Sequence, residues 1–139
     1  MKKIENYIEK EKYYLVDASK DTLGRISTKI AVLLTGKNSV NYRPNIIANN
    51  VVVVINADNV HLSGTKELSK QYFRHSGFHG GIKITNFSRL KKEKPEELIR
   101  KAVKGMLPKN RLQLKIIKNL KIFAANQHPY KISKDKNDD

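Results

Sequence analysis

The sequence predicts a single α/β domain with a largely parallel sheet, and three observations lead to this prediction. The chain has 139 residues, a length that suits one core better than two. Short β-branched or aromatic runs alternate with segments whose apolar residues recur at helical spacing, as in α/β folds. Residues 51–55 are Val-Val-Val-Val-Ile, a run typical of a central strand that is buried on both faces.

The N-terminal third predicts one strand followed by one helix. Residues 13–18 are apolar and aromatic and end in a turn, which indicates a short strand. Asp21 or Thr22 would cap the next helix, and Gly36 would end it. The apolar residues of that helix follow at helical spacing: Leu23, Ile26, Ile30 and Leu33.

The central part predicts strands separated by turns. After the run at 51–55, residues 56–59 should turn the chain and residues 60–62 should begin another short strand. Residues 71–73 indicate an extended segment. This segment enters residues 75–81, which contain too much glycine for regular structure.

The C-terminal third predicts two helices and a last strand. Pro95 is favourable at the first position of a helix, and Glu96 and Glu97 suit the positive end of its dipole. Four-residue spacing would allow Glu96 to pair with Arg100 and Glu97 with Lys101. Residues 109–121 have helical spacing of leucine and isoleucine, and residues 120–124 should form the last strand.

The charge balance indicates a polyanionic partner. The 28 Lys and Arg residues outnumber 13 Asp and Glu, giving a net charge of +15 and an isoelectric point near 10.0. Nearly all of this excess lies in residues 13–130, and no acidic residue occurs between Asp21 and Asp58, Glu67 and Glu93, or Glu97 and Asp135. Like charges repel in a compact fold, whereas unbroken cationic stretches suit phosphate neutralisation.

Other function classes find little support. Cysteine is absent, and no apolar run approaches the length of a membrane span. Asn38 stands where a phosphate-binding loop needs Ser or Thr after Gly36-Lys37, and Ala31 replaces its first glycine. His75 and His79 have a spacing that can hold zinc, but glycines interrupt it and no third ligand lies nearby.

The glycine-rich loop is better suited to binding RNA. Glycines allow the backbone to approach phosphates, and exposed aromatic rings can stack on unpaired bases. Phe78, between glycines, is the better stacking residue, while Tyr72 and Phe73 are more typical of a core. A nuclease that uses His75, His79 and Lys83 would lack nearby carboxylates to orient an imidazole or to hold magnesium.

An ordered set of short motifs runs along the chain: Val-Asp-Ala at 16–18, Thr-Leu-Gly-Arg at 22–25, Asn-Ala-Asp at 56–58, Arg-His-Ser-Gly at 74–77 and Gly-Gly-Ile-Lys at 80–83. The most specific motif is Val-Lys-Gly-Met-Leu-Pro at 103–108, and the order holds over about residues 13–128. This set resembles the bacterial large-subunit ribosomal protein thirteen family. Residues 47–50 depart from it: they are Ile-Ala-Asn-Asn, where the family usually has Asp-Thr-Gly-Asp. Gln113-Leu114 replaces Gly-Arg, and the usual Ala-Gln-x-Pro tail is absent.

The resemblance implies a three-layer α/β/α single domain with a mainly parallel sheet of about four strands. It also implies a structural role in organising large-subunit rRNA beside neighbouring large-subunit proteins, on a cytoplasmic or organellar ribosome. No catalysis, cofactor, metal, small-molecule substrate or membrane is implied. Residues 13–130 would form the domain, with charged extensions at 1–12 and 131–139.

We expect twelve basic side chains to contact RNA: Arg25, Lys37, Arg43, Arg74, His75, His79, Lys83, Lys104, Lys109, Arg111, Lys115 and Lys118. Two alternatives from other classes are an RNA-binding regulator that acts away from ribosomes and an RNA-processing enzyme. The regulator would bind RNA yet stay off ribosomes, and the enzyme would lose turnover when His75 or His79 becomes alanine.

Overall fold

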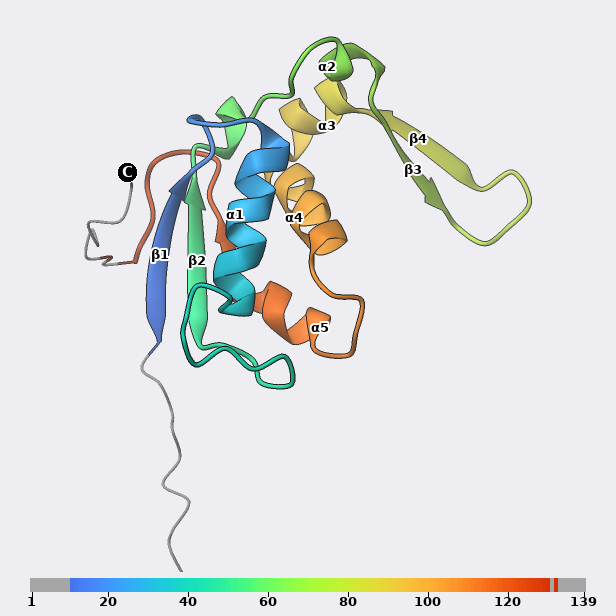
Figure 1. Cartoon of the computed structure of the whole chain (residues 1–139). Coiled ribbons are helices and arrows are strands. Elements are labelled where there is room, and N and C mark those ends of the chain that lie inside the picture. Colours follow the sequence, from blue (N-terminus) through green and yellow to red (C-terminus); the bar gives the residue numbers. More distant parts are fainter. Residues whose placement is uncertain (1–10, 131, 133–139) are drawn as a thin grey trace, which may run out of the picture.

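A three-stranded parallel sheet forms one layer of the computed structural model, which describes residues 11–130 and 132, and the helices lie to one side of it (Figure 1). Strand β2 (Asn50–Ile55) lies between β1 (Lys12–Asp17) and β5 (Leu120–Ile122). It runs parallel to both neighbours, with Tyr13 opposite Val51 and Val52 opposite Leu120. Every residue of β2 is buried, so the prediction of a central strand is confirmed.

The remaining elements connect and cover these strands. The helices are α1 (Leu23–Thr35), α2 (Lys66–Ser69), α3 (Phe87–Glu93), α4 (Pro95–Met106) and α5 (Gln113–Ile116), with short 3-10 turns η1 (Ala57–Asn59) and η2 (Ile117–Asn119). Strands β3 (Gln71–His75) and β4 (Ile82–Asn86) form a separate antiparallel hairpin. The hairpin projects from the body of the molecule (Figure 1).

Helix α1 ends where the sequence predicts. Gly36 has a φ of 76°, and its N–H donates to the carbonyl of Leu33 at 3.1 Å. The N–H of Lys37 donates to the carbonyl of Val32 at 3.1 Å. These bonds satisfy carbonyls that the last turn of a helix leaves open, and only glycine adopts this backbone conformation without strain.

The main core lies between one face of the sheet and helices α1 and α4. It contains Ile30 of α1, Val52 and Val54 of β2, and Leu98 and Val103 of α4. The opposite face of the sheet presents Val51, Val53 and Ile55, which pack against Tyr13, Leu15, Phe123, Tyr130 and Ile132. The α/β class and the mainly parallel sheet are therefore confirmed. Within the described residues the sheet has three strands, and aromatic and aliphatic side chains rather than helices cover its second face.

Two local predictions are wrong. Residues 60–62 form no strand: Val60 ends η1, and His61 forms a single isolated bridge with Thr22. Residues 109–121 do not form one helix, because only α5 and η2 are helical and Leu120 already belongs to β5. Pairing of Leu120 with Val52 requires extended backbone, which interrupts the helical spacing. The predicted charged extensions lie largely outside the described residues.

Ser27 offers a test of core packing within α1. It is fully buried, and its hydroxyl has no hydrogen-bond partner among the described residues. A buried hydroxyl without a partner costs roughly 1–3 kcal/mol, and alanine also has the higher helix propensity. We expect Ser27→Ala to raise the free energy of unfolding, measured in urea, by about 1 kcal/mol.

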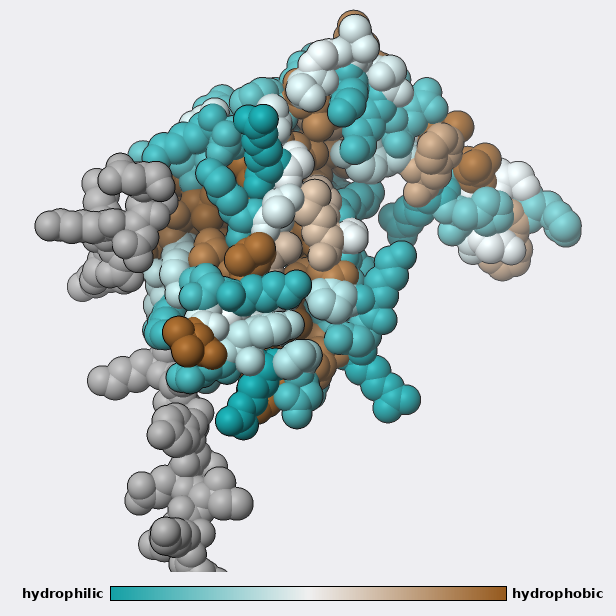
Figure 2. Space-filling view, viewed as in Figure 1, coloured by the Kyte–Doolittle hydropathy of each residue, from teal (hydrophilic) through white to brown (hydrophobic). Residues whose placement is uncertain are grey.

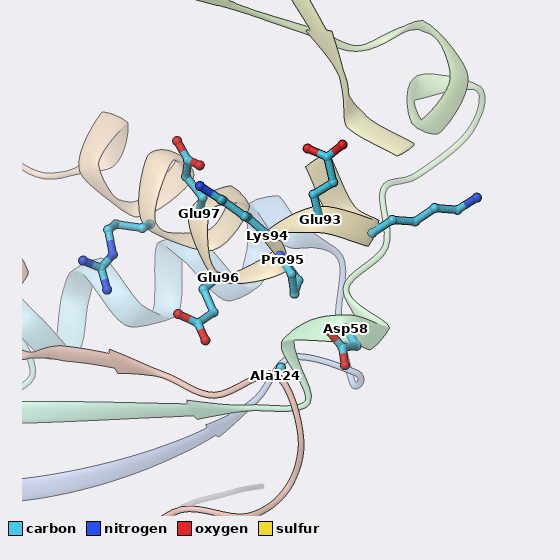
Figure 3. Close-up of a pocket in the computed structure, with 9 residues that line it drawn as sticks. Asp58, Glu93, Lys94, Pro95, Glu96, Glu97 and Ala124 are labelled. Atoms are coloured by element: carbon cyan, nitrogen blue, oxygen red, sulfur yellow. The ribbon is translucent and has the colours of Figure 1, made fainter. Parts of the chain in front are cut away.

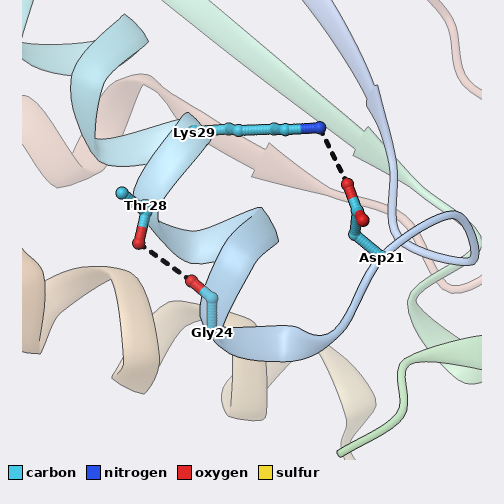
Figure 4. Close-up of polar contacts among 4 residues, drawn as sticks. All are labelled: Asp21, Gly24, Thr28 and Lys29. Atoms are coloured by element: carbon cyan, nitrogen blue, oxygen red, sulfur yellow. Dashed lines mark hydrogen bonds and ion pairs between the residues drawn. The ribbon is translucent and has the colours of Figure 1, made fainter.

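Thr28 provides the matched control for this substitution. It is exposed, and its hydroxyl donates to the carbonyl of Gly24 at 3.0 Å (Figure 4). Thr28→Ala should therefore change the free energy of unfolding by no more than about 0.5 kcal/mol. A lower stability of the Ser27→Ala variant would show that its hydroxyl makes a bond that stabilises the fold.

Candidate nucleic-acid interface

The twelve basic residues predicted to bind RNA are all exposed, and none forms an ion pair within the described part of the chain. The ion pairs there use other cations. Lys29 pairs with Asp21 at 2.7 Å (Figure 4), Arg89 with Glu93 at 2.7 Å, and Lys101 with Glu97 at 3.1 Å. The expected Glu97–Lys101 pair thus forms, whereas Glu96 and Arg100 make no ion pair in this part. The ten lysine and arginine side chains among the twelve are free to neutralise an external anion.

One group of these residues lies at the end of the β3–β4 hairpin. Arg74 and Lys83 are direct cross-strand partners, and like charges in this position destabilise a hairpin. His75 closes β3, and its Nδ1 accepts a hydrogen bond of 2.9 Å from the N–H of Gly77. His79 is exposed in the turn. The structure therefore places all four residues on one hairpin, with Arg74 opposite Lys83, and their contact with RNA stays a prediction.

A second group surrounds the C-terminal end of α4 and α5. Lys104 lies in the last turn of α4, Lys115 in α5 and Lys118 in η2, while Lys109 and Arg111 lie in the connecting loop. Lys104 is well placed because a cation near the C-terminal end of a helix interacts favourably with its dipole.

Gln113 fixes the position of that loop. Its Nε2 donates to the carbonyl of Lys104 at 2.8 Å and to that of Leu107 at 3.3 Å. These bonds satisfy carbonyls at the end of α4 and hold the loop that carries Lys109 and Arg111. No sequence pattern indicated this role, because Gln113 stands where the family resemblance anticipates a glycine.

The remaining three residues are divided between the two ends of the sheet. Lys37 and Arg43 lie in the connection between α1 and β2, and therefore at the edge where the parallel strands begin. The second basic group leads into β5 and lies at the same edge, as Figure 1 shows. Arg25 is at the start of α1, at the opposite edge, where its charge acts on Asp21.

Acidic residues gather at the edge where the strands end. Asp58 of η1, Glu93 of α3, and Glu96 and Glu97 of α4 line a shallow pocket around Pro95 (Figure 3). Glu67 joins Asp58 along an adjacent depression. These are five of the eight acidic residues in the described ranges 11–130 and 132. Four basic residues line the same pocket and depression: Lys91, Lys92, Lys94 and Arg100. Most carboxylates of the described residues therefore lie among cations at this edge, while Lys37, Arg43 and the second basic group lie at the other.

Asp17 stabilises the turn after β1. Burial alone would raise the pKa of Asp17, but hydrogen bonds from Asn56 and Ser19 lower the pKa below its ordinary value. Its Oδ1 accepts from Asn56 Nδ2 at 3.0 Å and from Ser19 N and Oγ at 2.9 and 2.7 Å. Because the folded pKa is lowered, the stabilisation is present above the unfolded value of about 3.8. It is lost as the pH falls through the folded pKa.

Replacing Asp17 therefore has a pH-dependent effect. We expect Asp17→Ala to lower the free energy of unfolding at neutral pH by about 1–2 kcal/mol. The variant should lose less of its remaining stability than the parent chain on acidification below about pH 4. Urea unfolding at several pH values measures both effects, and parallel acid-side slopes for the two proteins would contradict the assignment.

No three His, Asp or Glu side chains in ranges 11–130 and 132 gather closely enough to hold a metal ion. No helix in these ranges has both the length and the apolar character needed to span a membrane.

Comparison with known proteins tests the resemblance directly. The sequence pattern of the family described as Ribosomal protein L13 matches residues 11–129. "Large ribosomal subunit protein uL13" of Psychrobacter cryohalolentis is 48% identical over 124 residues, covering 89% of this chain and 87% of the relative. The protein of the same name from Treponema pallidum strain Nichols is 51% identical over 118 residues, covering 85% and 83%. That from Pelobacter propionicus is 48% identical over 128 residues, covering 92% and 89%. The chain therefore belongs to the ribosomal protein L13 family.

Proposed function

We propose that this protein is a structural constituent of the large ribosomal subunit, and that it binds and organises large-subunit rRNA during assembly without catalysing a reaction. Its relatives carry the name of a large-subunit protein. The observation that carries the proposal is the set of twelve exposed basic side chains that have no ion-pair partner in the described part of the chain. A fold gains no stability from such side chains, whereas an RNA-bound protein needs them.

The mechanism is electrostatic and architectural. Helices, strands and the loops between them present cations at two separate places, the hairpin tip and the edge where the parallel strands begin. Each place neutralises phosphates and releases counterions, which lowers the repulsion between RNA segments that converge on the protein. Recognition is mainly of RNA shape, because the protein carries no recognisable base-reading motif. The edge where most carboxylates gather (Figure 3) carries both signs of charge, so it is less suited to phosphate and suits contact with neighbouring proteins of the subunit.

Sedimentation in a sucrose gradient tests the proposal. A tagged copy of the full chain should travel with the large subunit in a bacterial lysate and remain there after a high-salt wash. Retention at the top of the gradient, with RNA still bound, would instead identify a regulator that acts away from the ribosome. Turnover of RNA that His75→Ala abolishes in a folded variant would identify an RNA-processing enzyme.

A further inference from the structure

The β3–β4 hairpin carries apolar side chains that no other part of the described chain covers. Phe73 and Ile84 are cross-strand partners, and they are 64% and 52% exposed. Phe78, in the turn between the strands, is 79% exposed. Figure 2 shows apolar surface on the projecting hairpin among hydrophilic side chains. A two-stranded hairpin in water is marginally stable by itself, so this surface is suited to a partner.

The base of the hairpin is anchored to the body of the protein. Tyr72 is half-buried against the main core, and Lys101 Nζ of α4 lies 5.4 Å from the centre of its ring. The N–H of Phe87 donates to the carbonyl of Lys70 at 2.9 Å. The hairpin therefore starts from a fixed position, and its tip is presented away from the sheet.

The turn also fixes the backbone of Phe78. The N–H of Gly81 donates to the carbonyl of Phe78 at 3.0 Å, and the N–H of Ser76 donates to the carbonyl of Gly81 at 3.0 Å. Gly80 has a φ of 69°, a conformation that the third position of a type II turn requires. A partner would meet a preorganised ring, and binding would require little further ordering of the backbone.

The charge of the hairpin that carries Phe78 indicates which kind of partner binds there. No acidic residue occurs between Glu67 and Glu93, so the whole hairpin is cationic. Arg74 and Lys83 lie opposite each other without an ion pair in the described structure, an arrangement that only an anion would make favourable. An exposed ring at the tip of a cationic hairpin matches single-stranded RNA, in which bases stack on aromatic side chains and basic groups follow the phosphates.

We propose that Phe78 stacks on an unpaired base of the RNA while Arg74 and Lys83 neutralise the phosphates of adjacent nucleotides. This inference rests on the proposed rRNA-binding function. Within that function, it assigns the hairpin tip to a single-stranded segment. Stacking on a phenylalanine ring is tolerant of base identity, so the site selects unpaired structure more than sequence.

The absence of tryptophan from the chain allows a direct test. Phe78→Trp places the protein's one tryptophan at the tip, and stacking on a base quenches its fluorescence. Leu68→Trp is the control, because Leu68 is 82% exposed on α2 beside Glu67. Binding of deproteinised bacterial large-subunit rRNA is followed separately by filter retention. We expect quenching in the Phe78→Trp protein and none in the control, and binding of poly(A)·poly(U) duplex should leave both emissions unchanged.

A second variant separates stacking from charge. Phe78→Leu should lower the affinity for the rRNA by roughly 5- to 100-fold and leave its salt dependence unchanged, whereas Phe78→Tyr should retain affinity. Retention of rRNA with unchanged emission of the Phe78→Trp protein would overturn the stacking site and leave the proposed function intact. Quenching of the Phe78→Trp protein in assembled subunits, without quenching on deproteinised rRNA, would contradict the stacking site and would indicate that Phe78 contacts a protein. Failure to retain any RNA would remove both proposals.

Discussion

Replacing Lys109, Arg111, Lys115 and Lys118 together with alanine will flatten the salt dependence of rRNA binding. Each phosphate contact contributes about 0.7–0.9 to the slope of log affinity against log salt concentration, so four lost contacts should reduce the slope by about 3. At about 0.1 M salt the affinity should fall roughly a thousandfold. Filter binding of labelled large-subunit rRNA over a range of salt concentrations measures both quantities.

A matched control removes the same charge from the opposite edge of the sheet. Lys91, Lys92, Lys94 and Arg100 line the pocket and depression where carboxylates gather. Their replacement with alanine should leave the salt slope nearly unchanged, although the net charge falls equally. Circular dichroism and urea unfolding establish that both variants are folded. Equal effects of the two substitutions would mean that net charge, rather than a localised surface, determines binding.

The elements that bury one regular apolar pattern were predictable from sequence. Helices α1 and α4 and strands β1, β2 and β5 each bury such a pattern in the core. Strand β4 was not predicted, because its apolar alternation consists of Ile82 and Ile84 alone and follows directly on a glycine-rich loop. Both side chains remain exposed in the structure. The predicted helix at 109–121 was wrong because the pairing of β5 with β2, a long-range contact, determines where extended backbone begins. Local spacing contains no information about that partner.

The candidate site was predictable in composition and only partly in arrangement. Gaps between acidic residues identified cations without partners, and the structure leaves the twelve chosen residues unpaired within its described ranges. The gathering of Lys37, Arg43 and the second basic group at the edge opposite most carboxylates depends on the parallel sheet. Because β2 lies beside β5 in this sheet, the loop between α1 and β2 and the segment that precedes β5 meet at one edge, although some seventy residues separate them. The role of Gln113 could not be predicted, because a side-chain amide that donates to two backbone carbonyls has no characteristic sequence pattern.

One departure from the family pattern has a structural counterpart beside Gly36. Residues 47–50 lack the usual two carboxylates, and Asn50 stands where the second is expected. Its buried Nδ2 donates to the carbonyl of Leu33 at 2.7 Å, the same carbonyl that accepts from the N–H of Gly36. An ionised aspartate could not donate this bond. The end of α1 and the start of β2 are therefore joined through one carbonyl, and Lys37 and Arg43 lie on the connection between them.

Gly36→Ala should accordingly be among the most damaging single substitutions in the chain. Its φ of 76° costs a residue with a side chain about 1–2 kcal/mol, and the added Cβ would lie 2.7 Å from the Cβ of Ala48. We expect a total loss of about 2–4 kcal/mol in the free energy of unfolding, measured in urea. Ala48→Gly removes the atom that clashes, so in that background Gly36→Ala should cost only the backbone strain of about 1–2 kcal/mol. Additive effects in this double-mutant cycle would show that the two residues do not touch. If they do touch, Gly36→Ala also displaces the connection that carries Lys37 and Arg43, and it should weaken rRNA binding at temperatures where the variant remains folded.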